Sequence, residues 1–196
     1  TWFFLASTEP ARLLATLRSR CRLHHLAPPP ESYAISWLAR EVTASSEALL
    51  SALRLSAGSP GAALTLLQAE SWAHRTDFCA ALVNTLNAGD WYILLAALNH
   101  DQAAARLHWL ATLLTDALKR PYGVSHLTNP DALDLISSIA ERLSVAQIQA
   151  ILGDVCHCRQ QLLNVTGVNR ELVLTDLILR IEHYLQPGTV LPVPHL

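Results

Sequence analysis

From residue 30 onward, hydrophobic positions recur along the chain at the spacing expected of helices that pack against a core. In the segment 30–42, the apolar residues fall on one side of a 3.6-residue repeat, which is typical of an amphipathic helix. Four residues form this stripe: Tyr33, Ile35, Trp37 and Leu38. The pattern therefore predicts a first amphipathic helix directly after the three prolines that end at Pro30.

Serine and glycine delimit two further short helices. Ser45 or Ser46 can cap a helix that runs to about residue 56, because a serine hydroxyl accepts a hydrogen bond from a free amide of the first turn. Gly58 stops that helix, and Ser59-Pro60 restarts the chain as N-cap and first helical residue. A helix to about residue 68 follows, so this region is predicted to form a compact unit of three helices.

The remainder of the chain is predicted to form five or six helices joined by short loops, which is typical of a bundle. Their approximate limits, read from the capping residues and breakers, are about 70–87, 90–99, 101–120, 129–143, 144–164 and 169–185. The tail from residue 189 contains Pro192 and Pro194 and is expected to be extended.

The first 27 residues follow a different pattern. The apolar run at residues 2–6 predicts a buried strand, Thr8 and Pro10 predict the start of a helix that reaches about Leu17, and a second short strand is expected at 22–26. Ala27 and three prolines then mark the best domain boundary. The chain contains no methionine and opens on this apolar run, so we expect it to be the C-terminal part of a longer protein.

Composition narrows the classes of function. Hydrophobic residues make up 51% and charged residues 15% of the chain, which is typical of an ordered globular protein. A net charge of −2 argues against nucleic-acid binding by the molecule as a whole. The single lysine, Lys119, follows Leu118 instead of glycine, so the chain has no P-loop for ATP. Four cysteines without disulfide spacing, and no signal peptide or membrane-spanning run, predict a cytoplasmic protein without a membrane partner.

Two candidate sites have simpler explanations. Cys156-His157-Cys158 invites a zinc site, but consecutive helical residues point about 100° apart and no second ligand pair stands nearby, so no metal site is predicted and the thiols are expected at a helix interface. Ser59 lies in Gly-Ser-Pro-Gly, which is not the nucleophile motif GxSxG, and a helix cap explains it. No catalytic triad is predicted.

A third candidate is a basic, aromatic helix face that could contact nucleic acid. It comprises Arg106, His108, Trp109, Lys119 and Arg120. The same helix also carries Asp101 and Asp116, so we interpret this face as solvated, with a cationic last turn that complements the helix dipole. Trp72, Trp91 and Trp109 are predicted to be core residues.

The stretch Arg18-Ser19-Arg20-Cys21 ends the first predicted helix. Taken alone, Arg20 is expected to donate to the last carbonyls of that helix. The run Trp2–Pro10 followed by Leu13–Cys21, however, resembles the end of an AAA+ ATPase domain of the clamp-loader family, where a buried strand ends in small polar residues and a short helix ends in Ser-Arg-Cys. Residues 55–64 resemble the sensor-2 helix start of that family, and residues 169–179 resemble its last collar helix.

The resemblance covers the whole chain and implies a mainly α fold in three parts. These are the end of an AAA+ α/β domain (1–27), a three-helix lid (28–69) and a collar bundle of five or six helices (70–196). In the family, the collars of five subunits close a ring that opens a sliding clamp and places it on primed DNA. The implied partners are the gamma or tau subunits, the delta subunit, the sliding clamp and the DNA.

The resemblance also assigns roles to residues. Arg20 matches an arginine finger that reaches the ATP of a neighbouring gamma or tau subunit, Ser19 and Cys21 match its flanks, and Ser7 or Thr8 matches a sensor-1 position. Where ATP-hydrolysing relatives carry a sensor-2 arginine, this chain has Pro60-Gly61. The chain is therefore expected to bind no cofactor of its own and to catalyse nothing alone. The alternatives are a generic helical adaptor, in which Arg20 only caps a helix, and a free-standing enzyme, for which no convergent residues are found.

Overall fold

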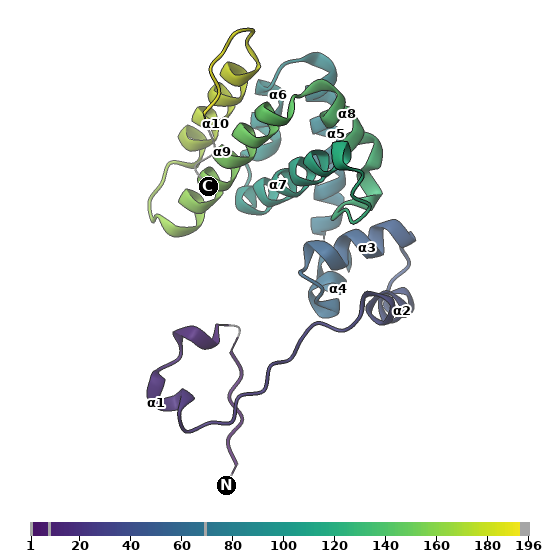
Figure 1. The fold of residues 1–196 in the computed structure, drawn as a ribbon, viewed down its shortest axis with the longest axis vertical. Coiled ribbons are helices and arrows are strands. Elements are labelled where there is room, and N and C mark those ends of the chain that lie inside the picture. Colours follow the sequence, from purple (N-terminus) through teal and green to yellow (C-terminus); the bar gives the residue numbers. More distant parts are fainter. Residues whose placement is uncertain (1, 8, 69, 193–196) are drawn as a thin grey trace.

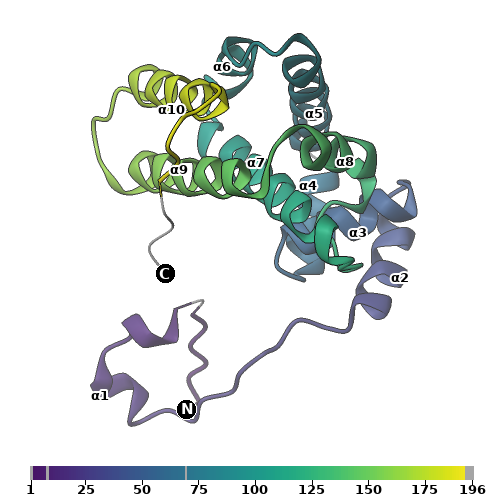
Figure 2. The same ribbon diagram turned by 45° about the horizontal axis from the view of Figure 1, so that its top comes forward.

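The computed structural model describes residues 2–7, 9–68 and 70–192, and these residues form helices, turns and irregular segments without any strand. A small unit of helices joins a larger bundle, and the first segment of the chain runs apart from both (Figures 1 and 2). The small unit contains α2 (Glu31–Glu41), α3 (Ser46–Leu55) and α4 (Pro60–Gln68). The bundle contains α5 (Glu70–Ala88), α6 (Tyr92–Leu98), α7 (Ala103–Lys119), α8 (Leu133–Arg142), α9 (Val145–Asn164) and α10 (Arg170–Leu185). The prediction of a mainly α fold is confirmed.

The strands predicted at 2–6 and 22–26 are wrong for this chain. Trp2, Phe3 and Phe4 are 90%, 85% and 95% exposed, and Leu26 is 91% exposed. A strand is stabilised by hydrogen bonds to a neighbouring strand, and no described residue offers one. These segments are therefore irregular.

The single helix predicted to reach Leu17 is also wrong. The structure has a 3₁₀ turn, η1 (Pro10–Arg12), and one helical turn, α1 (Ala15–Arg18), separated by extended backbone at Leu13 and Leu14. Neither element contains a buried residue, so no packing supports a longer helix. Thr8, predicted as its cap, lies outside the described residues.

The small unit forms where the serine and glycine signals predict it. Ser45 is the N-cap of α3 and accepts a hydrogen bond from the Ala48 amide at 3.1 Å, and Ser59 accepts one from the Ala62 amide at 3.4 Å. The three helices enclose one small core: Ala34, Leu38, Leu49, Ala52, Leu53 and Ala63.

The turn between α3 and α4 is a Schellman motif. The Gly58 amide donates to the Leu53 carbonyl at 2.9 Å and the Ala57 amide to the Arg54 carbonyl at 3.1 Å. Both turn residues have positive φ, 51° at Ala57 and 79° at Gly58. Gly58 suits this conformation, but Ala57 carries a Cβ that disfavours it.

We therefore expect Ala57→Gly to raise the free energy of unfolding by about 0.5–1 kcal/mol, since it relieves the left-handed backbone at the helix end. Urea unfolding followed by circular dichroism measures this change. Ala62→Gly, inside α4, is the control and is expected to lower stability by about 1 kcal/mol. A destabilised Ala57→Gly variant would contradict the argument.

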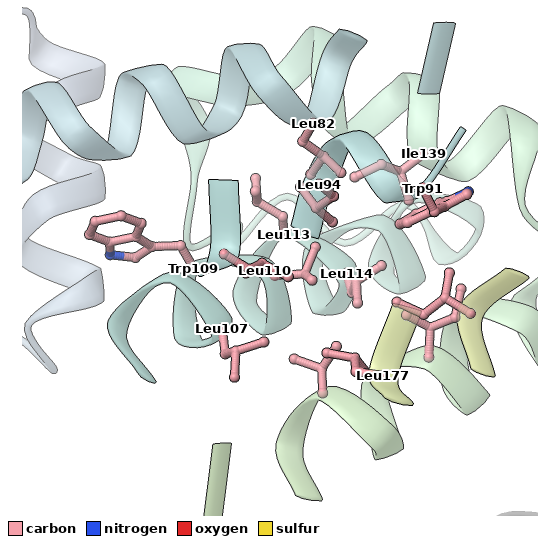
Figure 3. Close-up of a cluster of buried hydrophobic side chains, with 14 of the residues drawn as sticks. Leu82, Trp91, Leu94, Leu107, Trp109, Leu110, Leu113, Leu114, Ile139 and Leu177 are labelled. Atoms are coloured by element: carbon pink, nitrogen blue, oxygen red, sulfur yellow. The ribbon is translucent and has the colours of Figure 1, made fainter. Parts of the chain in front are cut away.

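The bundle is organised around α7, which packs against α8 and α9 and also contacts α5 and α6. Figure 3 shows Leu110, Leu113 and Leu114 of this helix between Leu82 and Leu94 on one side and Leu177 on the other. Trp91 and Trp109 are each 4% exposed and belong to the same core, as predicted, whereas Trp72 is half-buried against the core of the small unit.

The last two long helices begin with side-chain caps. Ser144 and Gln147 form a capping box at the start of α9, and Asn169 accepts a hydrogen bond from the Leu172 amide at the start of α10. Among the described residues, no single helix is long and apolar enough to cross a membrane. The segment Pro130–Arg142 and α9 reach that length and composition only together, across a bend of 116°.

Candidate functional site

The predicted site residue Arg20 lies in the turn just after α1. The chain ends its helical turn at Ser19, whose amide donates to the Ala15 and Leu17 carbonyls and whose hydroxyl donates to the Thr16 carbonyl at 3.2 Å. The Arg20 amide closes the turn by donating to the Leu17 carbonyl at 3.2 Å. The last carbonyls of α1 are thus bonded by backbone amides and Ser19.

The guanidinium of Arg20 is exposed and has no hydrogen-bond or ion-pair partner within the described residues. It does not donate to the end of α1, so the interpretation of Arg20 as a carbonyl donor is not supported by the structure. Cys21 is exposed and free. The motif Ser19-Arg20-Cys21 therefore presents its arginine outward.

Arg20 lies in a stretch of sequence whose only charged side chains, apart from the histidines, are arginines. Residues 10–30 contain four arginines and no acid: Arg12, Arg18, Arg20 and Arg22. Arg12 pairs with Glu9, just before this segment, at 2.9 Å. A segment that carries arginines and no carboxylate of its own favours an anionic ligand such as a phosphate, whose oxygens match the planar donors of a guanidinium.

The sensor-1 candidates are not brought together with Arg20 by any described contact. Ser7 is exposed, and its hydroxyl accepts a hydrogen bond from the Glu9 amide at 3.1 Å. Thr8 lies outside the described residues. The Ser7 hydroxyl is thus bonded to the backbone two residues further along the chain.

The residues predicted at the sensor-2 position, Pro60 and Gly61, lie at the start of α4. Pro60 and Gly61 form its first turn, so no cationic side chain stands there. A Cβ added at Gly61 would meet no atom within 4 Å. A larger residue could be accommodated at Gly61, and packing alone does not explain the glycine.

Three cationic side chains of the candidate basic face, on α7 and the turn after it, have hydrogen-bond or ion-pair partners within the molecule. Arg106 donates to the Ala97 carbonyl, and Arg120 donates to the Ser137 hydroxyl at 3.0 Å. Lys119 pairs with Asp116 at 2.9 Å. The interpretation of Asp116 as part of a solvated face is wrong, because its side chain is fully buried and accepts hydrogen bonds from the loop after α7. Burial, followed by the charge of Arg159, lowers the pKa of His108.

The two cysteines of α9, Cys156 and Cys158, lie in different environments, one exposed to solvent and one buried. Cys158 is buried, whereas Cys156 and His157 are exposed, so the expectation that both thiols lie at a helix interface holds for Cys158 only. No group of three His, Cys, Asp or Glu side chains in the described part of the chain converges as metal ligands.

Burial, together with nearby Asp176 and Asp154, raises the pKa of the Cys158 thiol to about 11. We therefore expect a thiol reagent at pH 8 to modify Cys156 quickly and Cys158 only after unfolding. Mass spectrometry of peptides after timed labelling checks this difference. Equal labelling rates of Cys156 and Cys158 in the folded chain would contradict this placement.

The raised pKa of Cys158 also makes the stability of the fold depend on pH. The contribution of the protonated thiol to the free energy of unfolding is present below about pH 9 and is lost as the pH rises through about 11.

Sequence reasoning missed one cluster of buried polar side chains between the small unit and the bundle. It comprises Ser51, Arg75, Asp116, Asn129 and the largely covered carboxylate of Asp131. The sequence contains a signal for this cluster, because the spacing of Arg75, Phe78 and Leu82 places the arginine on the apolar face of α5. An arginine on an apolar face requires a buried partner.

Comparison with known proteins supplies a family for both helical units. Residues 29–68 match the family described as DNA polymerase III subunit delta', AAA+ ATPase lid domain, and residues 69–183 match that of DNA polymerase III, delta subunit, C terminal. The chain is 68% identical to the DNA polymerase III subunit delta' of Escherichia coli K12 and 43% identical to that of Yersinia pestis, over its whole length. It is 29% identical over 92% of its length to that of Haemophilus influenzae.

The chain covers 59% of the Escherichia coli and Yersinia pestis proteins and 56% of the Haemophilus influenzae protein. It thus spans less than two thirds of the length of these relatives.

Proposed function

This chain belongs to the family defined by the C-terminal region of the DNA polymerase III delta subunit, and we propose that it is the lid and collar part of a delta'-type subunit of a sliding-clamp loader. The observation that carries the proposal is the likeness to a delta' subunit over every residue of the chain. The loader acts in DNA replication in the cytoplasm, opening the sliding clamp and placing it on primed DNA. This chain contributes to the ring and catalyses nothing alone.

The proposed division of the chain is an AAA+ domain end at 1–27, a lid at 28–69 and a collar at 70–196. Two separate hydrophobic cores support the boundary between lid and collar, one built by α2 to α4 and one by α5 to α10. The extended prolines 28–30 support the boundary before the lid.

Arg20 is the proposed arginine finger, acting on ATP bound by a neighbouring gamma or tau subunit. Its exposure, the absence of acids at 10–30 and the turn held by Ser19 support this role. A guanidinium is always charged and its planar donors match phosphate oxygens, so it stabilises charge that develops during phosphoryl transfer. Ser19 and Cys21 flank the proposed finger, and Ser7 or Thr8 is proposed for the sensor-1 position.

No nucleotide is proposed for this subunit's own lid. In ATP-hydrolysing relatives, a sensor-2 arginine at the start of this helix contacts phosphate, and Pro60-Gly61 cannot do so by charge. The ATP on which Arg20 acts is therefore held by the neighbour.

The collar is proposed to contact the gamma or tau and delta subunits through exposed apolar residues. Leu163 at the end of α9 is 56% exposed, and Leu172 and Leu179 on α10 are 66% and 50% exposed. Exposed leucines that repeat at 172 and 179 lie on one side of α10, as expected of a helix that packs against a partner.

Co-purification of the full-length subunit with gamma or tau and delta subunits tests the proposal. Leu172→Asp with Leu179→Asp is expected to weaken assembly about 30-fold or more, as loss of central apolar contacts does. Val190→Asp, in the exposed tail, is the control and is expected to assemble normally. A wild-type subunit that does not join the ring would favour the generic helical adaptor.

A further inference from the structure

Lid and collar meet through both apolar and polar contacts. Leu55 of α3 packs on the collar core, and Trp72 of α5 packs on the lid core. The lid helix α3 also packs against η3 (Pro130–Ala132), the 3₁₀ turn that precedes α8. Apolar contact is non-directional, so it holds two units together without setting their angle. Hydrogen bonds with fixed geometry can set it.

The centre of this contact is Arg75 of α5, which is 2% exposed. Its guanidinium donates to both carboxylate oxygens of Asp131, at 2.5 and 3.1 Å, and to the side-chain oxygen of Asn129 at 2.8 Å. Its Cζ lies 4.8 Å from the ring centroid of Trp72. A bidentate arginine on a carboxylate fixes both distance and plane, which gives this pair directional strength.

The carboxylate of Asp131 continues the connection into the lid. Its Oδ1 accepts a hydrogen bond from the Ser51 hydroxyl at 2.5 Å, and the Ser51 oxygen accepts one from the Asp131 amide at 3.3 Å. Ser51 lies on α3 and is fully buried. One side chain of the lid thus shares a carboxylate with an arginine of the collar.

An arginine of the lid, Arg54, bonds the same loop. Arg54 of α3 donates to the Leu127 carbonyl and also pairs with Glu31 of α2 at 2.8 and 3.0 Å. The hydrogen bonds from Arg54 lower the pKa of Glu31. Two successive turns of α3 are therefore tied to the loop between α7 and α8.

The loop is itself anchored in the collar core. Asp116 of α7 accepts hydrogen bonds from the Asn129 amide and side chain at 2.8 and 2.9 Å, and from the Thr128 amide at 3.0 Å. Asn129 in turn bonds Arg75. The polar chain is continuous from the collar core, through the loop, to α3.

We propose that the polar joint, comprising Ser51, Arg54, Arg75, Asn129 and Asp131, fixes the angle between the lid and the collar. Arg75 and Arg54 are positioning residues. Without them each unit keeps its own hydrophobic core, but the angle between the lid and the collar is no longer fixed. Burying ions costs desolvation energy that apolar packing would not, so a joint of this kind serves orientation more than stability. If the chain acts as proposed above, the same angle places Arg20 relative to the neighbouring subunit.

The angle can be measured on the chain without its partners, so the result is independent of ring assembly. Spin labels at Ser32→Cys on α2 and Gln149→Cys on α9, both exposed positions, report the lid-to-collar distance by pulsed electron paramagnetic resonance. The exposed thiols are removed by Cys21→Ser and Cys156→Ser, and burial raises the pKa of both remaining thiols, Cys79 and Cys158.

The intact joint is expected to give one narrow distance. Arg75→Met is expected to broaden it, and Arg54→Met with Arg75→Met to abolish the single peak, with helix content by circular dichroism unchanged. Arg142→Met is the matched control, since Arg142 joins α8 to Leu86 and Asn87 within the collar, and it is expected to keep the narrow peak.

A narrow, unshifted peak in the double variant would overturn the proposal. Equal broadening in the Arg142→Met control would overturn it as well, since the effect would then be general loosening. Should the methionine variants fail to fold, Arg75→Lys with Ser51→Ala decides the question: lysine keeps the charge but not the planar fork. A broadened peak supports the joint, and an unchanged one refutes it.

Discussion

Arg20→Ala in the full-length subunit is expected to lower ATP hydrolysis at the adjoining site about 10³- to 10⁵-fold, the range that arginine fingers supply in GTPases. This corresponds to about 4–7 kcal/mol of activation free energy. The reason is that the Arg20 guanidinium is exposed, has no partner among the described residues and lies in a segment, 10–30, that contains no acid. It is therefore free to stabilise the negative charge that develops on a transferred phosphoryl group. Alanine removes the positive charge but keeps the turn intact, because the turn is held by the Ser19 hydroxyl and by backbone amides.

The measurement is DNA- and clamp-stimulated ATP hydrolysis by a reconstituted loader in which the adjoining ATP site is the only competent one. Ring assembly is checked in parallel, because a ring that fails to form would also lose activity. Arg18→Ala and Arg22→Ala are matched controls from the same arginine-rich segment and are expected to change the rate far less. An assembled ring with an unchanged rate would show that Arg20 is not a finger.

Asp116→Ala is expected to lower the free energy of unfolding by about 3–5 kcal/mol, the cost of breaking a buried charged pair from one side. The carboxylate is fully buried and accepts hydrogen bonds from two loop amides, the Asn129 side chain and Lys119. Removing it leaves these donors without their acceptor inside the protein.

Urea unfolding followed by circular dichroism measures this loss. Glu141→Ala, an exposed acid on α8, is the control and is expected to stay within about 0.5 kcal/mol of the wild type. A loss below about 1 kcal/mol for Asp116→Ala would mean that water replaces the carboxylate, and the loop would then not be anchored as described.

Helix limits were predictable because their causes are local. Ser45, Ser59 and Asn169 bond amides within three residues of themselves, so the residue type and its position relative to an apolar repeat are enough to place a helix start. The same local reasoning failed at residues 2–6, where an apolar run predicts a strand but hydrogen bonds from another strand are needed. Asp116 was misjudged for a related reason, since periodicity alone did not reveal the loop that covers it.

The amino-acid sequence by itself determined the mainly helical fold, the approximate limits of the helices in the small unit and the bundle, and the motif that places Arg20 next to Ser19 and Cys21. Only the tertiary structure decided that Arg20 faces outward without a partner among the described residues, and that Arg75 and Ser51 share the carboxylate of Asp131. Those partners lie 56 and 80 residues apart along the chain. Hydrogen bonds between such distant residues depend on how whole helices pack, and no local spacing in the sequence encodes that arrangement.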